Sequence, residues 1–193
     1  MNYLNELGVK FFKSSRGGGS TYTGPGQLVF YPIVDYEKIV GRELGVGEYK
    51  NLLDKVMLRV LKLYNIDAKA VEVKEKIGDL DDDFARSDRR DIWVVRDGKN
   101  YKIGAKGIHI SGNIAYHGFN IFVKDFGLDG FSKVLVCGYP KDLLDVTCIE
   151  REMREDIEID EVKRCVKDAI GMEFGYLDII DANLNQLFVR DEI

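Results

Sequence analysis

Cys137 is the residue of this chain whose surroundings best suit covalent chemistry. It follows the apolar run 134–136 and precedes Gly138. A strand that ends at a Cys-Gly step exposes the thiol together with a backbone N–H that no side chain shields, which suits a nucleophile beside an oxyanion site. The alternative is a buried, inert thiol, the commoner state of a free cysteine. Cys165 is expected in the core, on the apolar face of a helix, and Cys148 gives no signal.

A glycine-rich stretch, residues 14–26, contains five glycines and one proline. Its backbone can approach a ligand closely, and the amides of residues 16–19 could bind an anion or a carbonyl oxygen. The stretch lacks the lysine and the following helix of a phosphate-binding P-loop, and a plain flexible loop is the alternative. His109 and His117 have no third ligand at zinc-like spacing, so we expect hydrogen-bonded structural roles for them and no metal.

Four motifs in order resemble the octanoyl-(acyl carrier protein):protein octanoyltransferases, or lipoate–protein ligase B type, of the biotin/lipoate protein ligase superfamily. Residues 16–29 (RGGGSTYTGPGQLV) resemble the family signature RGGxxTYHGPGQLV. Residues 93–94 with 102–108 (WV, KIGAKGI) resemble its WV…KIxxxG block, and residues 117–121 (HGFNI) its HGxxxN block. Residues 137–139 (CGY) resemble the PCGxx block that holds the nucleophile. Four motifs in one order are a specific signal.

The resemblance implies an α+β fold, with a mixed, mostly antiparallel sheet and flanking helices. It implies transfer of an octanoyl or lipoyl group from acyl carrier protein to a lysine of a lipoyl domain, in a 2-oxoacid dehydrogenase or the glycine cleavage H protein. Carried over by position, Cys137 is the nucleophile that becomes an acyl-thioester. Lys102 is its activating partner, because a nearby ammonium favours the thiolate. Attack of a thiolate on a thioester forms a second thioester of similar energy, so no ATP or other cofactor is implied.

The resemblance also assigns residues of three motifs to the acyl and thioester site. They are Arg16, Gly17, Gly18, Gly19, Ser20, Thr21, Tyr22, Thr23, Ala105, Lys106, Gly107, His117, Gly118, Phe119 and Asn120. Two of them depart from the family pattern. Thr23 stands where the family usually has histidine, and Lys106 stands where an apolar residue is usual. The Lys106 side chain therefore turns either into the acyl pocket or to solvent.

Val136 replaces the usual proline before the cysteine, and length is the largest departure, because family members usually carry a helix-and-strand segment ahead of the first motif. Only fifteen residues precede Arg16 here. We therefore expect a second chain to cover an open sheet edge, unless residues 150–193 fold back over it. Residues 1–149 are predicted to form the catalytic domain and 150–193 a helical extension packed on it. The alternative functions are an ATP-dependent lipoate or biotin ligase and a non-catalytic subunit of a two-chain acyltransferase.

The strands that must position these residues follow from hydrophobic patterns and turn residues. Residues 9–12, 27–34 and 70–73 each predict a strand, and Pro32 places the end of the second near a sheet edge. The Asp97-Gly98 step predicts a hairpin between residues 92–96 and 101–103. The Gly112-Asn113 step predicts a second hairpin between residues 106–111 and 114–123.

Two main helices are predicted beside these strands. Residues 47–64 have apolar side chains at i, i+3, i+4 and i+7, which indicates one buried face. Asp160 is expected to cap a helix that ends at Gly171. Short helical turns are expected at residues 129–131 and 141–144. The acidic stretch 74–91 matches no calcium loop, so we expect a solvated loop.

Composition places limits on the class of protein. The chain has 193 residues, 45% hydrophobic and 32% charged, which excludes disordered and fibrous proteins. A net charge of −5 argues against non-specific binding to nucleic acid or to an acidic membrane surface. No apolar run is long enough to span a bilayer, and three cysteines fit a reducing compartment, so a cytoplasmic location is expected.

Overall fold

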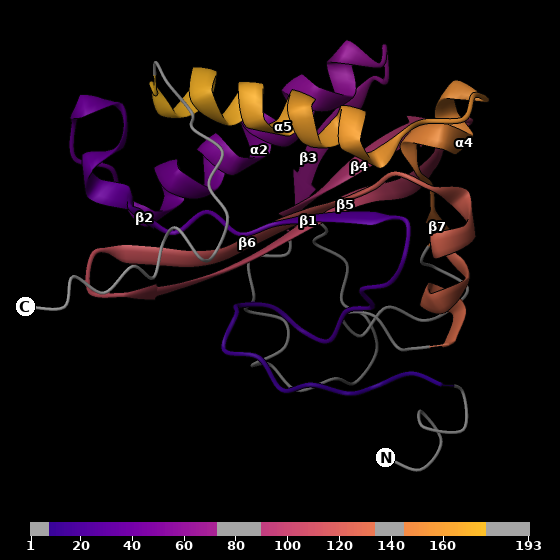
Figure 1. Cartoon of the computed structure of the whole chain (residues 1–193), viewed down its shortest axis with the longest axis horizontal. Coiled ribbons are helices and arrows are strands. Elements are labelled where there is room, and N and C mark those ends of the chain that lie inside the picture. The colour runs from indigo at the N-terminus through magenta and orange to yellow at the C-terminus, as the bar shows by residue number, and fades with distance from the viewer. Residues whose placement is uncertain (1–7, 73–89, 134–144, 177–193) are drawn as a thin grey trace, which may run out of the picture.

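The structure is a computed structural model that describes residues 8–72, 90–133 and 145–176. Figure 1 shows helices α2 (Val46–Leu63) and α5 (Ile159–Phe174) together on one side of a sheet. The segment that precedes β1 (Gln27–Phe30) runs along the opposite side of the sheet. The sheet therefore has a helical layer on one face and an irregular chain segment on the other.

The described strands form one sheet in the order β1-β6-β5-β4-β3, with all neighbours antiparallel. Besides β1, these are β3 (Ala68–Glu72), β4 (Arg90–Arg96), β5 (Lys99–Ser111) and β6 (Ile114–Phe122). The short strand β2 (Val34–Asp35) pairs with β6, and β7 (Asp145–Val146) runs parallel to β5. The expected α+β fold with a mostly antiparallel sheet is confirmed.

Both predicted hairpins are present, and their turns explain the register. Asp97 and Gly98 have φ of 52° and 73°, which gives the type I′ turn that matches the twist of β4 and β5. Gly112 has φ of 56° at the second turn. Strand β5 is continuous across residues that the sequence pattern divided into two strands. A register shift lets Lys102 face Trp93 while Gly104 faces Ile92, so Ile103 forms a bulge.

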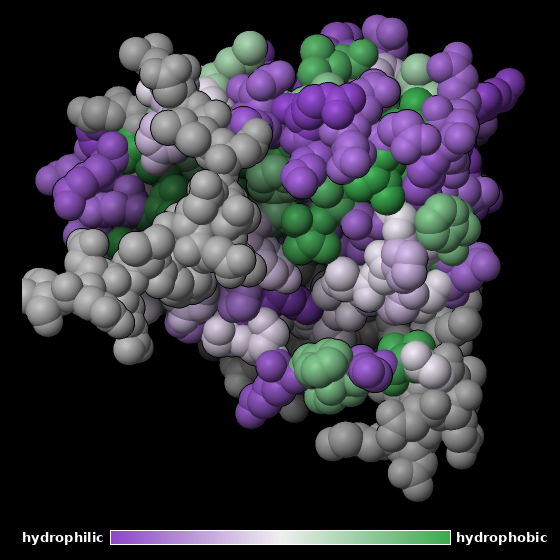
Figure 2. Space-filling model, viewed as in Figure 1, coloured by the Kyte–Doolittle hydropathy of each residue, from purple (hydrophilic) through white to green (hydrophobic). Residues whose placement is uncertain are grey.

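The main core lies between the sheet and the two long helices. Buried apolar side chains of α2, among them Leu53 and Met57, pack with Val166 and Phe174 of α5 and with residues of the sheet. Burial of each such side chain contributes about 1.5–3 kcal/mol relative to exposure. Figure 2 shows hydrophilic residues over much of the outward surface on the helical side, as expected for amphipathic helices.

Several local expectations are wrong. Residues 9–12 form no strand, and Phe11 and Phe12 are 58% and 79% exposed. The strand expected over residues 27–34 is split into β1 and β2 around Pro32, which has no N–H for a ladder hydrogen bond.

Helix α5 also differs at both ends. Glu158 is its N-cap and Asp160 lies in the first turn. The helix continues through Gly171 and ends at Gly175, whose φ of 74° is the left-handed conformation that glycine adopts without strain.

The remaining described elements are short. They are the 3-10 helices η1 (Tyr36–Gly41), η2 (Asp125–Gly127) and η3 (Asp129–Lys133), and helix α4 (Ile149–Met153). The turn η3 confirms the helical expectation for residues 129–131. Cys137, the expected turn at 141–144 and all but the last two residues of the acidic stretch lie outside the described residues.

The predicted division at residue 150 remains a prediction. Helix α5 shares its core with α2 and the sheet. No helix in the described part of the chain combines the length and apolar character that a membrane crossing requires. The cytoplasmic location also remains a prediction.

Candidate functional site

A cavity of about 670 Å³, including its mouth, is lined by the glycine-rich loop, β1 and the strands β4, β5 and β6. Its lining joins the three sequence motifs that the resemblance assigned to substrate binding. The lining residues are Arg16, Gly18, Gly19, Thr21, Thr23, Val29, Tyr31, Asp91, Ala105, Lys106, Gly107, Gly118, Phe119 and Asn120. Residues far apart in the chain therefore meet around one concave site, the usual form of a small-molecule site.

Two glycines that face each other on β5 and β6 let the loop and β1 approach the hairpin. Gly107 pairs with Gly118, and the Gly17 amide donates to the carbonyl of Ile108 at 2.8 Å. A Cβ on Gly107 would lie 2.7 Å from the carbonyl oxygen of Gly17. A Cβ on Gly118 would lie 2.2 Å from the carbonyl oxygen of Phe30. Glycine is required at both positions because any side chain would push these segments apart.

Lys102 lies in β5, buried behind the cavity wall. Its side chain is 1% exposed, and its Nζ donates to Asp91 Oδ2 at 2.6 Å. The same Nζ lies 5.9 Å from the ring centroid of Trp93, the residue opposite it on β4. Asp91 itself lines the cavity, so the ion pair places a carboxylate at the wall and a buried ammonium 2.6 Å from that carboxylate. A charged pair this deeply buried needs mutual neutralisation to be tolerated.

The structure decides between the two orientations left open for Lys106, because its side chain does not turn to solvent. The side chain is 7% exposed, and its Nζ donates to Asp54 Oδ1 on α2 and to the Arg90 carbonyl, the latter at 3.1 Å. Arg90 Nε also lies 3.2 Å from Asp54 Oδ2. Lys106 belongs to the cavity lining, and its charge is compensated by an aspartate from the helical layer.

Asn120 connects three strands beside the cavity. Its Oδ1 accepts from the Ala105 amide at 3.0 Å, and its Nδ2 donates to Gln27 Oε1 at 2.9 Å. The side chain is therefore held from both ends between β5 and β1. This arrangement fixes the wall that Asn120 and Ala105 form together.

Among the predicted site residues that the structure describes, five do not line the cavity. They are Gly17, Ser20, Tyr22, Lys102 and His117. Tyr22 instead packs edge-on against Phe131, in a second apolar cluster, with ring centroids 5.5 Å apart. His117 bonds Ser15 at 3.1 Å, and His109 Nδ1 bonds the Ser15 carbonyl at 2.7 Å, which confirms hydrogen-bonded roles for both histidines.

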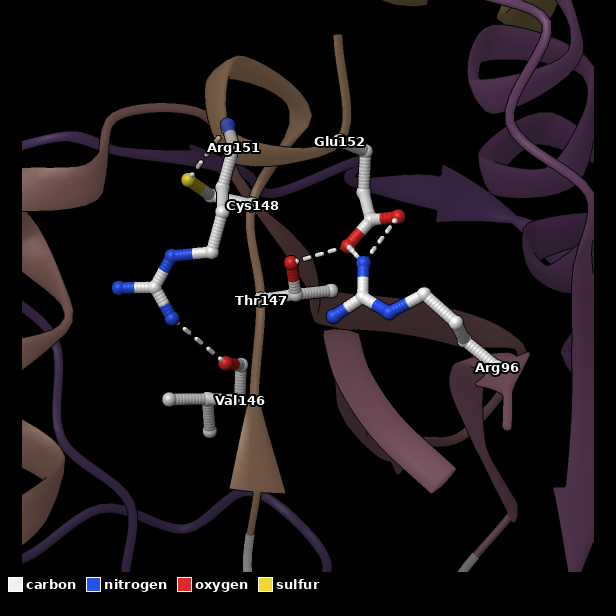
Figure 3. A network of polar contacts seen from close by, with 6 residues as sticks. All are labelled: Arg96, Val146, Thr147, Cys148, Arg151 and Glu152. Atoms are coloured by element: carbon white, nitrogen blue, oxygen red, sulfur yellow. Dashed lines mark hydrogen bonds and ion pairs between the residues drawn. The ribbon is translucent and has the colours of Figure 1, made fainter. Parts of the chain in front are cut away.

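Strand β7, which follows the segment that contains Cys137, is fixed beside Lys102. Thr147 donates its amide to the Lys102 carbonyl at 2.9 Å. Figure 3 shows how the next residues hold this strand: Thr147 Oγ1 donates to Glu152 Oε1 at 2.5 Å, and Arg96 Nη1 donates to both oxygens of Glu152 at 3.0 and 3.1 Å. Residues 145–147 are thus bonded to the strand that carries Lys102.

The two described cysteines are structural. Cys148 is fully buried at the N-terminus of α4, where its Sγ accepts from the Arg151 amide at 3.4 Å (Figure 3). Burial raises the pKa of the Cys148 thiol to about 11. Cys165 is partly buried against the main core, as expected. Neither thiol lies at the cavity.

Asp91, Val29 and Tyr31 line the cavity and were not assigned to it from the sequence. Asp91 could have been found from the hairpin register. The Asp97-Gly98 turn places Trp93 opposite Lys102, and Asp91 precedes Trp93 by two residues, hence on the same face of β4. Val29 and Tyr31 are likewise two residues apart, in β1 and directly after it, so their side chains face the same side of the sheet.

Comparison with solved structures defines the class of fold. A chain of a bipartite lipoate protein ligase structure from Thermoplasma acidophilum matches with a TM-score of 0.63 and 14% identity, over 94% of this chain and 64% of that chain. A lipoate-protein ligase A structure bound with ATP matches with a TM-score of 0.64 and 18% identity, over 90% of this chain and 62% of that chain. The fold is therefore that of the lipoate protein ligases, as the sequence resemblance implied.

The chain belongs to the lipoyl protein ligase A/B catalytic domain family, whose sequence model matches residues 1–171. Octanoyltransferase of Desulfotalea psychrophila is 31% identical over 93% of this chain and 70% of its own length. Octanoyltransferase of Caldicellulosiruptor bescii is 33% identical over 90% of this chain and 66% of its own length. The chain thus spans about two thirds of the length of these relatives. The expected resemblance to octanoyltransferases, which are acyltransferase enzymes, is confirmed.

Proposed function

We propose that this chain transfers an octanoyl group from acyl carrier protein to a lysine of a lipoyl domain through an acyl-thioester on Cys137. The observation that carries the proposal is the buried Lys102–Asp91 pair at the wall of a cavity built from the family motifs. The relatives named octanoyltransferase support the acyl group and the reaction class.

Cys137 is within chain reach of Lys102 because of the strand that follows it. It precedes Asp145 by eight residues, and Asp145 and Val146 pair with Tyr101 and Lys102. Eight residues span at most about 28 Å when fully extended. The anchor supplied by Thr147, Glu152 and Arg96 therefore tethers the proposed nucleophile to the strand that carries its proposed partner.

Each proposed residue has a defined task in the two transfers. The Lys102 ammonium favours the Cys137 thiolate, which attacks the carbonyl carbon of the donor thioester. The carrier thiolate leaves and takes up a proton, and an acyl-cysteine remains. The target lysine amine then attacks this acyl group, the C–S bond breaks, and the amine gives up a proton as the amide forms. Lys102 and Asp91 form the adjacent pair through which that proton passes.

The proposed acceptor is a lipoyl domain, of a 2-oxoacid dehydrogenase or of the glycine cleavage H protein. One structural relative is described as a bipartite ligase together with its E2 lipoyl domain, which supports an acceptor of this kind. A second chain that completes this protein remains a prediction. It is tested by light scattering of the pure chain together with its transfer activity, and a fully active monomer would contradict it.

The decisive experiment incubates the chain with octanoyl-acyl carrier protein and follows its intact mass without ATP. We expect an added octanoyl group on Cys137, its absence in Cys137→Ala, and its retention in Cys165→Ala, the matched control. Addition of a lipoyl domain should then move the group to that domain. Transfer that requires ATP and survives Cys137→Ala would identify a ligase instead, and no transfer under either condition would indicate a non-catalytic subunit.

A labelling experiment tests the assigned lysine. Lys102→Met should raise the pH at which iodoacetamide labels Cys137, because it removes the charge that favours the thiolate. Lys106→Met is the control, because the Lys106 ammonium is bound to Asp54 in the helical layer. A shift in the control alone would mean that the two lysines have the opposite roles.

A further inference from the structure

Two imidazoles from neighbouring strands hold one residue of the glycine-rich loop. His109 on β5 bonds the Ser15 carbonyl through Nδ1 at 2.7 Å. His117 on β6 bonds the Ser15 hydroxyl through Nε2 at 3.1 Å. A carbonyl oxygen only accepts, so Nδ1 of His109 carries the proton of this hydrogen bond. Both polar groups of Ser15 that face the hairpin are therefore engaged, each by a different histidine.

The rings of both histidines belong to an aromatic cluster that fixes their orientation. Tyr116 lies between them, with ring centroids 4.9 Å from His109 and 5.1 Å from His117. Tyr31, a residue of the cavity wall, meets the His117 ring edge-on at 5.5 Å. His117 also has φ of 59°, a left-handed conformation that is uncommon for residues other than glycine. Its contacts must outweigh that backbone cost.

The position of Ser15 makes these contacts relevant to the cavity. Ser15 directly precedes Arg16, which lines the cavity, and the amide of Gly17 donates to the carbonyl of Ile108, the residue before His109 on β5. Ser15 and Gly17, the residues on either side of Arg16, are thus both bonded to the β5–β6 hairpin.

We propose that His109 and His117 are positioning residues that clamp Ser15 and thereby hold the Arg16 wall of the cavity in place. This role differs from the substrate contact that the family motif implied for His117. The predicted effect of the clamp on acyl transfer rests on the proposed function. The clamp itself is a pair of hydrogen bonds to Ser15 and does not depend on that function.

The two ring nitrogens allow a crossed test. An asparagine amide can replace the Nδ1 of histidine, and a glutamine amide reaches the position of Nε2. His109→Asn and His117→Gln should therefore preserve the clamp, whereas His109→Gln and His117→Asn should break it. A role in packing alone would depend on side-chain size and would not give this crossed pattern.

Trypsin cleavage after Arg16 measures the clamp without any activity assay. A protease must free several residues around the bond it cuts, so cleavage follows local opening of the loop. Cleavage after Lys10, five residues before Ser15, serves as the internal reference. Loss of one such hydrogen bond should raise the ratio of Arg16 to Lys10 cleavage about fivefold. Ser15→Ala, which removes the hydroxyl that His117 binds, should also raise the ratio. It should have no further effect in the His117→Asn background, where that hydrogen bond is already lost.

The outcomes separate the clamp from the proposed function. Equal cleavage ratios in all four histidine variants would overturn the clamp, whatever the transfer assay shows. If the clamp exists and the transfer function is correct, the two breaking variants should raise KM for the acyl donor by more than they lower kcat. A crossed cleavage pattern in a chain that transfers no acyl group would retain the clamp and reject the function.

Discussion

The buried pair of Lys102 and Asp91 makes a quantitative prediction about stability. Asp91→Leu removes the carboxylate and leaves an ammonium that is 1% exposed, whereas Lys102→Met leaves a carboxylate that borders the cavity. Breaking a buried pair by removing one partner costs about 3–5 kcal/mol, because the other charge stays buried without compensation. We expect Asp91→Leu to lie in that range. Lys102→Met should cost less, about 2 kcal/mol, since water in the cavity can reach the carboxylate.

The double variant should recover most of this loss. Replacing both charges by apolar side chains of similar size is often neutral, so Asp91→Leu/Lys102→Met should unfold within about 1 kcal/mol of the unaltered chain. For a chain of this length, 3 kcal/mol corresponds to a fall in Tm of about 6–12 °C. All three variants should fail to transfer the acyl group, which separates the role of the pair in stability from its role in chemistry.

Trp93 provides the assay, because it is the one tryptophan of the chain and its ring lies beside Lys102. Urea unfolding followed by its fluorescence, checked by circular dichroism, gives the free energy of unfolding for each variant. The reasoning would be refuted if the costs of the two single variants simply added in the double variant. Additive costs would mean that the two charges do not compensate each other.

Three further predictions concern single residues elsewhere. Cys148 should resist iodoacetamide at pH 9 in the folded chain, and labelling of Cys148 at pH 9 equal to that in urea would contradict this. The free energy of unfolding should fall as pH rises from about 8.5 to 11, because the unfolded thiol releases its proton first. Gly107→Ala should displace the loop, since its Cβ would lie 2.7 Å from the Gly17 carbonyl oxygen, and should lower stability by about 1–3 kcal/mol and transfer activity with it. Gly47→Ala, the matched control, lies in α2 with no atom near its Cβ position, so thermal unfolding should show a gain of about 0.5–1 kcal/mol.

Local patterns predicted the scaffold well. The apolar spacing of residues 47–64 predicted α2, and the Asp97-Gly98 step predicted the hairpin that β4 and β5 form. Both elements depend on interactions between residues close in the chain, so apolar spacing and turn residues are enough to predict them. The expected strand at residues 9–12 was wrong because a short apolar run specifies no partner strand, and none pairs with it.

The cavity could be predicted in part. Motif order identified most of its lining, because the loop, β5 and β6 each carry a recognisable block of residues. Tyr22 and His117 stand within those blocks, yet one packs in an apolar cluster and the other bonds Ser15. A motif states which residues occur together, and it does not state which of them face the cavity.

The sequence by itself determined the class of fold, the order of the hairpins and the set of motifs that meet at the cavity. Only the tertiary structure decided what each charged or polar side chain binds. Lys106 bonds Asp54 across 52 residues of sequence, and His117 bonds Ser15 across 102 residues. The physical reason is that strands and turns arise from neighbouring residues, whereas a partner for a buried charge is supplied by whichever distant element packs against it.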